Sequence, residues 1–229
     1  MKRYTIAIAA IYCTLSLHAQ IPIEAGIFAG TTTYQGDLAE NQVELSELHF
    51  AFGAMVRYHF DEKFKLRANV IYGRISGKDA NAKDPALHAR DWSFNSYIVE
   101  TSLTMEYHPF GRSREDEVGL FRRQNSPYVG TGIGLANFDP SVKTTRPGDF
   151  ERFPERGSST SSITVPLIVG ITFDFSRFFL LGLEGGSRIT FNDYLDGVSK
   201  NGNPKKKDLF IFVGVSFTYF VGYEESFRF

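Results

Sequence analysis

Residues 49–60 alternate between large apolar side chains and small or polar ones. In the segment HFAFGAMVRYHF, Phe50, Phe52 and Phe60 belong to the first set, whereas Gly53 and Arg57 belong to the second. A period of two places the sets on opposite faces of a β-strand. The segment has about twelve residues, longer than the usual strand of a soluble sheet and sufficient for a tilted strand to cross a bilayer. Its polar face suits the inside of a narrow barrel whose other face meets lipid.

Seven further stretches show similar alternation. We expect strands at residues 24–33, 49–60, 64–76, 93–108, 127–138, 162–175, 178–191 and 209–220. The second and sixth strands are followed by tight turns, at Asp61–Lys63 and Ser176–Arg177, whereas the first, third, fifth and seventh are followed by long polar loops. Outer-membrane barrels have long outside loops and short periplasmic turns, so both termini are predicted to be periplasmic. Pro166 falls inside the sixth strand and predicts a bulge.

The predicted fold class is therefore all-β: an eight-stranded antiparallel transmembrane β-barrel in the outer membrane of a Gram-negative cell. Residues 20–229 form its single domain. The chain has 229 residues and a net charge of −1, which gives no basic surface for nucleic acid. No stretch after the N-terminal segment is long and apolar enough for a membrane helix. A secreted or periplasmic soluble β-sandwich is the alternative.

Residues 1–19 are predicted to be a secretory signal peptide. Lys2 and Arg3 precede a mostly apolar segment at 6–17 that is too short to span a membrane as a helix. Cleavage is expected after Ala19. The single cysteine, Cys13, lies within this segment, so the mature chain has no disulfide, thiolate metal site or thiol nucleophile. In a lipoprotein, the alternative, Cys13 would be the first mature residue, and the bulky side chain before it argues against that.

The predicted inward faces carry four positive and four negative side chains. An eight-stranded barrel is just wide enough for side chains to fill, and an unpaired buried charge is costly. We therefore expect these charges to pair as a plug; the alternative is a conduction path or proton relay. The plug residues are Glu24, Arg57, Lys65, Arg67, Glu100, Glu106, Glu184 and Arg188.

No catalytic, metal or cofactor site is predicted. The histidines at positions 49, 59 and 108 are expected on the inward faces near strand ends, as polar rim residues, because no His, Asp or Glu cluster has ligand spacing. No G-x-S-x-G elbow or metalloprotease helix is present. We predict that the protein is not an enzyme, with a lipid-modifying barrel hydrolase as the alternative. Lys205–Lys207 lie on a predicted outside loop, where they either contact lipopolysaccharide phosphates or are solvated.

Four segments carry a resemblance to a known family. They read YQGDL at 34–38, PYVGTG at 127–132, GLEGG at 182–186 and FNDYLDGVS at 191–199. In order and spacing they resemble the PorG-type outer-membrane β-barrel family of Bacteroidota, over nearly the whole mature chain. The signature residues of the Y-x-G-D-L and D-Y-L-D-x-V-S motifs are Tyr34, Gly36, Asp37, Leu38, Asp193, Tyr194 and Asp196. The residues 221–229 extend beyond the expected end of the last strand.

The resemblance implies a part in type IX protein secretion, in contact with a periplasmic ring of the PorK lipoprotein and its partner PorN. Among the predicted periplasmic connections, 109–126 alone is large enough to present a surface, and it combines charge with an apolar centre, as interfaces do. Its contact candidates are Arg112, Arg114, Glu115, Asp116, Glu117, Leu120, Phe121, Arg122 and Arg123. The 221–229 tail is the second candidate, and a solvated turn is the alternative.

The predicted function is a plugged, non-enzymatic barrel that anchors or orients this ring. A stand-alone barrel for surface binding or membrane tethering is the alternative. It would use the long outside loops instead of the periplasmic connection.

Overall fold

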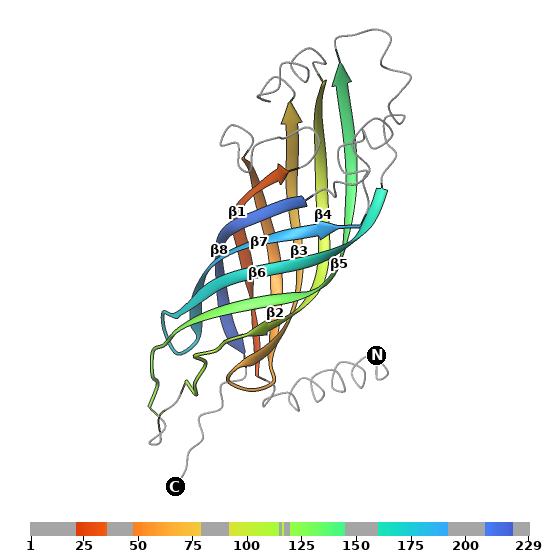
Figure 1. The fold of residues 1–229 in the computed structure, drawn as a ribbon. Helices are drawn as coiled ribbons and strands as arrows, with labels where there is room; N and C mark the ends of the chain where they lie inside the picture. The colour runs from red at the N-terminus through yellow and green to blue at the C-terminus, as the bar shows by residue number, and fades with distance from the viewer. Residues whose placement is uncertain are drawn as a thin grey trace, which may run out of the picture.

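Eight antiparallel strands close into one barrel, each paired with its neighbours in sequence and β1 paired with β8 (Figure 1). The computed structural model describes residues 22–35, 48–78, 92–114, 116, 120–144, 160–191 and 209–221. The strands are β1 (Ile23–Gln35), β2 (His49–His59), β3 (Phe64–Lys78), β4 (Trp92–Tyr107), β5 (Asn125–Thr144), β6 (Thr160–Asp174), β7 (Phe179–Thr190) and β8 (Leu209–Val221). The predicted fold class and strand count are confirmed. The predicted signal peptide lies outside the described residues. Within the described ranges, no helix is long and apolar enough to cross a membrane.

The two short turns lie at one end of the barrel, where β1 begins and β8 ends (Figure 1). Asp61 Oδ1 accepts hydrogen bonds from the backbone N–H groups of Lys63 and Phe64, both at 2.7 Å. Ser176 Oγ accepts in the same way from Phe178 and Phe179. These side chains mimic backbone turns, as Asp and Ser commonly do. We call this end the turn end and the opposite end the loop end.

The β5 strand is longer than predicted, because residues 139–144 continue it instead of forming a loop. They pair with the start of β4, from Asp139 opposite Tyr97 to Thr144 opposite Trp92. The sequence there contains Pro140 and polar residues, which is why it was interpreted as a loop. The adjacent backbone of β4 provides the hydrogen-bonding partners that local propensity does not reveal.

The bulge predicted at Pro166 is absent. The β5–β6 pairs run from Asn125 opposite Phe173 to Thr131 opposite Leu167, and then from Gly134 opposite Thr164 in the same register. Because the register is unchanged across the gap, no extra residue is inserted. The β5–β6 pairing is interrupted beside Pro166 instead, because proline has no N–H group to donate.

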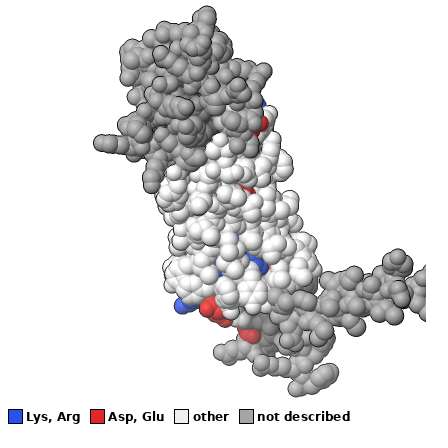
Figure 2. Space-filling model, turned by 90° about the vertical axis from the view of Figure 1, so that its right-hand side faces the viewer, with Lys and Arg blue, Asp and Glu red and all other residues white. Residues whose placement is uncertain are grey.

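Apolar side chains cover the outside of the barrel and polar ones fill much of its inside. Phe50 is 89% exposed and Ile27 61%, whereas Arg57 and Arg67 are 0% exposed. Among described strand residues with exposed side chains, Asp139 near the loop end alone carries a charge. Figure 2 shows the middle of one face as an almost uncharged band. This inverted distribution is that of a β-barrel integrated in the outer membrane.

Aromatic side chains surround the turn end. Phe64 packs against Tyr107 with ring centroids 5.1 Å apart, and Phe178 stacks on Tyr219 at 5.9 Å. Phe175, in the β6–β7 turn, is 70% exposed. Amphipathic and aromatic rings concentrate at the boundary between acyl chains and headgroups, so this belt marks where the barrel leaves the hydrocarbon.

Candidate functional site

The half of the lumen nearer the turn end contains a network of five charged side chains. Arg57 contacts Glu24 at 2.6 Å, Glu106 at 2.9 Å and Glu184 at 3.6 Å. Arg67 binds both carboxylate oxygens of Glu184, each at 2.7 Å, and approaches Glu106 at 3.3 Å. All five side chains are buried. Each carboxylate therefore has a guanidinium partner in a space where an unpaired charge would be very unfavourable.

The strand register explains why the network has this composition. Arg57 and Arg67 are directly paired across β2 and β3, which places two positive charges side by side. Like charges in this position repel each other. Glu106 from β4 and Glu184 from β7 each contact both arginines and so offset the repulsion. The pairing depends on closure of the barrel, because β7 is not a neighbour of β2 or β3 in the sheet.

Sequence analysis did not identify Tyr128 as part of this network. Its hydroxyl donates a 2.6 Å hydrogen bond to Glu184, and its ring stacks on His108 at 5.0 Å. Gly170, the partner of Tyr128 in β6, makes room for the ring: a Cβ at that position would lie 2.6 Å from it. Tyr128 shares the inward face with Gly130, so the alternation of β5 contained the signal.

Two histidines expected at the rim instead bind network carboxylates. His108 is fully buried and contacts Glu106 at 3.4 Å, and His59 contacts Glu24 at 3.1 Å. Within the described ranges, no group of three or more His, Cys, Asp and Glu side chains is arranged to hold a metal ion. In this arrangement the histidines act as hydrogen-bonding partners of carboxylates that arginines already neutralise.

The eight predicted plug residues do not form one cluster. Glu100 and Arg188 form a separate pair, at 3.3 Å, farther from the turn end. Lys65 is buried, but none of its contacts with the other described charges is close enough for an ion pair. The prediction of a charged plug is thus met by seven residues in two groups. Alternation reveals the face of a side chain but not its height in a barrel of tilted strands.

The half of the lumen nearer the loop end, here called the apolar half, contains a cluster of buried apolar side chains together with buried Ser and Thr side chains such as Thr32 and Ser96. Phe28, Phe210 and Phe212 are buried there, with ring centroids 5.5 Å apart for Phe210 and Phe212 and 6.5 Å for Phe28 and Phe212. The cluster comprises Phe28, Ala51, Met55, Ile71, Ile75, Phe94, Ile98, Ala136, Phe138, Phe210 and Phe212. Together the two groups of buried side chains line the described lumen.

The connection between β4 and β5 folds against the turn end of the barrel. Arg114 contacts Asp174 at 3.4 Å, donates to the backbone oxygen of Ser176 at 3.2 Å, and lies 5.0 Å from the ring of Phe220. Gly111 packs so closely on Glu62 that a Cβ would overlap the Glu62 carbonyl oxygen. The connection is thereby fixed to β6, β8 and both short turns.

The structure separates the predicted partner-contact residues. Arg114 points into the barrel end and Phe121 lies against it, at 5.7 Å from its guanidinium to the ring centroid. Leu120 is 66% exposed, and the backbone N–H of Leu120 binds the Asp116 carboxylate at 2.8 Å. Arg112, Arg122 and Arg123 are exposed and line one pocket. Glu115 and Glu117 lie outside the described residues.

The family-motif residues are mostly outside the described part of the chain. Tyr34 lies in β1, where its backbone pairs with Phe210 of β8. The remaining motif residues, Gly36, Asp37, Leu38, Asp193, Tyr194 and Asp196, lie outside the described residues, as do Lys205–Lys207 and the tail after Val221.

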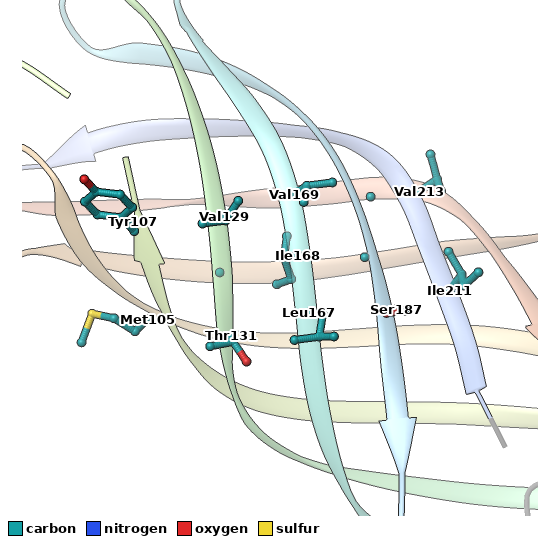
Figure 3. Close-up of a pocket in the computed structure, with 13 residues that line it drawn as sticks. Met105, Tyr107, Val129, Thr131, Leu167, Ile168, Val169, Ser187, Ile211 and Val213 are labelled. Atoms are coloured by element: carbon teal, nitrogen blue, oxygen red, sulfur yellow. The ribbon is translucent and has the colours of Figure 1, made fainter. Parts of the chain in front are cut away.

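A shallow depression of about 720 Å³ lies on the outer, lipid-facing wall across β4 to β8 (Figure 3). Gly185 and Ser187 form its low floor, between Leu167 and Val169 on one side and Ile211 and Val213 on the other. A Cβ at Gly185 would lie 3.6 Å from Val213, so the glycine leaves space that a side chain could fill. The lining is suited to an acyl chain.

The barrel is similar to outer-membrane proteins of known structure. The attachment invasion locus protein Ail of Yersinia pestis, in complex with a heparin analogue, shares 11% identity over 87% of this chain and 99% of that chain, with a TM-score of 0.46. OprG from Pseudomonas aeruginosa shares 12% over 87% and 97%, also with 0.46. Neisserial surface protein A shares 14% over 86% and 96%, again with 0.46. At these scores the fold assignment rests on the closed sheet itself.

No curated protein matches the chain. The model of the family described as "Domain of unknown function (DUF6089)" matches residues 2–228, and the chain therefore belongs to that family.

Proposed function

We propose that this barrel is a non-enzymatic outer-membrane component of the type IX secretion machinery, which anchors or orients the periplasmic ring of PorK and PorN. The proposal starts from the resemblance of its motifs to the PorG-type family. It places the turn end and both termini in the periplasm, in accordance with the usual position of short turns. The integral outer-membrane barrel supplies the anchor.

The observation that carries the proposal is the packing of the β4–β5 connection. Arg114 and Gly111 fix it to the barrel end, while the side chain of Leu120 remains 66% exposed. An exposed apolar residue on a preorganised support, surrounded by polar groups, is a suitable anchor for a protein partner because little ordering entropy is lost on binding. The filled lumen is consistent with a docking role rather than with passage of secreted proteins.

The test is recovery of the ring with purified barrel variants. Leu120→Asp places a charge at the centre of the proposed contact and should reduce co-purification of PorK and PorN by about tenfold or more, as expected for loss of an interface hot spot. Phe175→Ser is the matched control, because Phe175 is an exposed apolar residue in a different turn at the same end. Both variants are first checked for the heat-dependent gel shift of a folded barrel.

Undiminished ring recovery with Leu120→Asp, at normal levels of folded barrel, would contradict docking through the connection. Normal secretion in a deletion strain would contradict the assignment to the machinery and favour the stand-alone barrel. Altered lipopolysaccharide mass spectra in that strain would favour the lipid-modifying enzyme.

A further inference from the structure

Three arginines line a small pocket in the β4–β5 connection. The pocket, of about 250 Å³, is lined by Phe110, Arg112, Arg122, Arg123, Gln124 and Asn125. Two hydrogen bonds join the segments that carry Arg112 and Gln124. The backbone N–H of Arg112 donates to Gln124 Oε1 at 3.2 Å, and Gln124 Nε2 donates to the Arg112 carbonyl at 3.1 Å. The arrangement is therefore built into the fold of the connection.

The positive charge of this pocket is not neutralised within the described part of the chain. Arg112, Arg122 and Arg123 form no ion pair there. Of the described acidic groups near the connection, Asp116 accepts from the backbone of Leu120 and Asp174 pairs with Arg114. Glu115 and Glu117 lie outside the described residues. Guanidinium groups suit phosphate because their planar donor arrangement matches its oxygens, so a pocket lined by three arginines is a candidate phosphate site.

The pocket lies at the level where a bilayer places its phosphates. Phe110 lines it and is 66% exposed, only three residues beyond Tyr107 of the aromatic belt. Aromatic belts occupy the headgroup boundary, so arginines just beyond the belt face the headgroup layer.

The lipid-facing depression begins beside this pocket. Tyr107 and Val129, which line the depression, are paired across β4 and β5. Asn125 of the pocket lies on the same outward face of β5 as Val129, about 13 Å away along the strand. Strands β5 to β8 lie one above another on the front face in Figure 1, so the depression extends away from the turn end. Figure 3 shows its apolar walls on β5, β6 and β8.

We propose that the arginine pocket and the depression together bind one anionic phospholipid. The phosphate lies among Arg112, Arg122 and Arg123, and an acyl chain follows the depression over Gly185 towards Val213. The pocket and the depression are both needed to define the ligand. The arginines bind the phosphate, and the depression favours a lipid over a soluble anion. The site does not include Leu120, on which the proposed ring contact depends.

The test measures retention of dioleoyl phosphatidylglycerol by the full barrel in detergent, using native mass spectrometry. The wild-type barrel should retain one such lipid in preference to dioleoyl phosphatidylcholine. Arg122→Gln with Arg123→Gln should weaken retention by about tenfold or more, since charge-assisted hydrogen bonds are lost. Lys63→Gln is the matched control, because Lys63 is an exposed cation in a turn at the same end.

A second arm tests the groove without touching the charges. Gly185→Leu should fill the depression and weaken retention of the lipid severalfold, whereas Ala29→Leu adds comparable bulk, one carbon less, to the exposed face of β1 and should have no effect. Equal retention by the arginine double variant and the wild type would overturn the site. Equal competition by millimolar glycerol phosphate would show a soluble-anion site instead. Preferential capture of an acidic peptide by the pocket would assign it to a protein partner.

Discussion

The two halves of the lumen are filled by different chemistry. Near the turn end, Arg57 and Arg67 are joined to three carboxylates by contacts between 2.6 and 3.6 Å. Near the loop end, buried phenylalanine and isoleucine side chains pack together. The ionic half requires nearly every partner to be present, because removal of one leaves a buried charge. In the apolar half, the stability lost on substitution depends on the side-chain volume removed, so small substitutions should have small effects. We therefore expect substitutions in the ionic half to reduce stability more than substitutions in the apolar half.

The largest effect is expected where one member of the ionic network is removed. Arg67→Met takes away both bonds to Glu184 and leaves its carboxylate with the Tyr128 hydroxyl at 2.6 Å and, as its only cation among the described residues, Arg57 at 3.6 Å. The free energy of unfolding should fall by about 3–5 kcal/mol. Urea unfolding in lipid vesicles, followed by fluorescence of the single tryptophan, measures it.

Two further variants show whether the stability lost in Arg67→Met comes from the ionic network. Lys63→Met, in an exposed turn, should change stability little. Adding Glu184→Met to Arg67→Met should recover part of the lost stability, because the stranded charge is then removed. A loss below about 1 kcal/mol for Arg67→Met, or no recovery in the double variant, would refute the description of this half as a coupled network.

An intermediate effect is expected at the isolated pair. Glu100→Gln removes the charge opposite Arg188, but Arg188 keeps its 2.8 Å bond to the Gly186 carbonyl and its place 4.8 Å above the ring of Phe212. Stability should fall by about 1.5–3 kcal/mol in the same unfolding assay. A loss as large as that of Arg67→Met would indicate that the pair belongs to the network after all.

The smallest effect is expected in the apolar half. Ile98→Val deletes one methylene from a fully buried side chain and should cost about 0.5–1.5 kcal/mol. The loss should be the same at low and high salt, because no charge is involved. A strong salt dependence of the Ile98→Val effect would remove the distinction between the two halves.

The sequence predicted the outside of the barrel and the ionic half better than the apolar half. Charged residues such as Arg57 at alternate positions can only face inward in a membrane strand, so their burial follows from the pattern. In β8, Gly214, Ser216 and Thr218 alternate with apolar residues, and continuing this alternation puts Phe210 and Phe212 on the inward face, where they are buried. The alternation does not reveal which other buried rings they contact.

Contacts between distant strands were also beyond prediction. Arg67 and Glu184 are 117 residues apart, and their meeting depends on the tilt and stagger of the closed sheet. The same stagger separates Glu100 and Arg188 from the main network. Alternation assigns a face to each residue, and barrel geometry then decides its neighbours.

The central claim is that the two differently built halves seal a barrel that acts by docking. Conductance of the purified, refolded wild-type protein across a planar lipid bilayer tests it most directly. We expect no persistent ion current after insertion, because side chains fill the lumen from Glu24 to Phe210. A stable open channel with reproducible single-channel conductance in the wild-type barrel would contradict the claim.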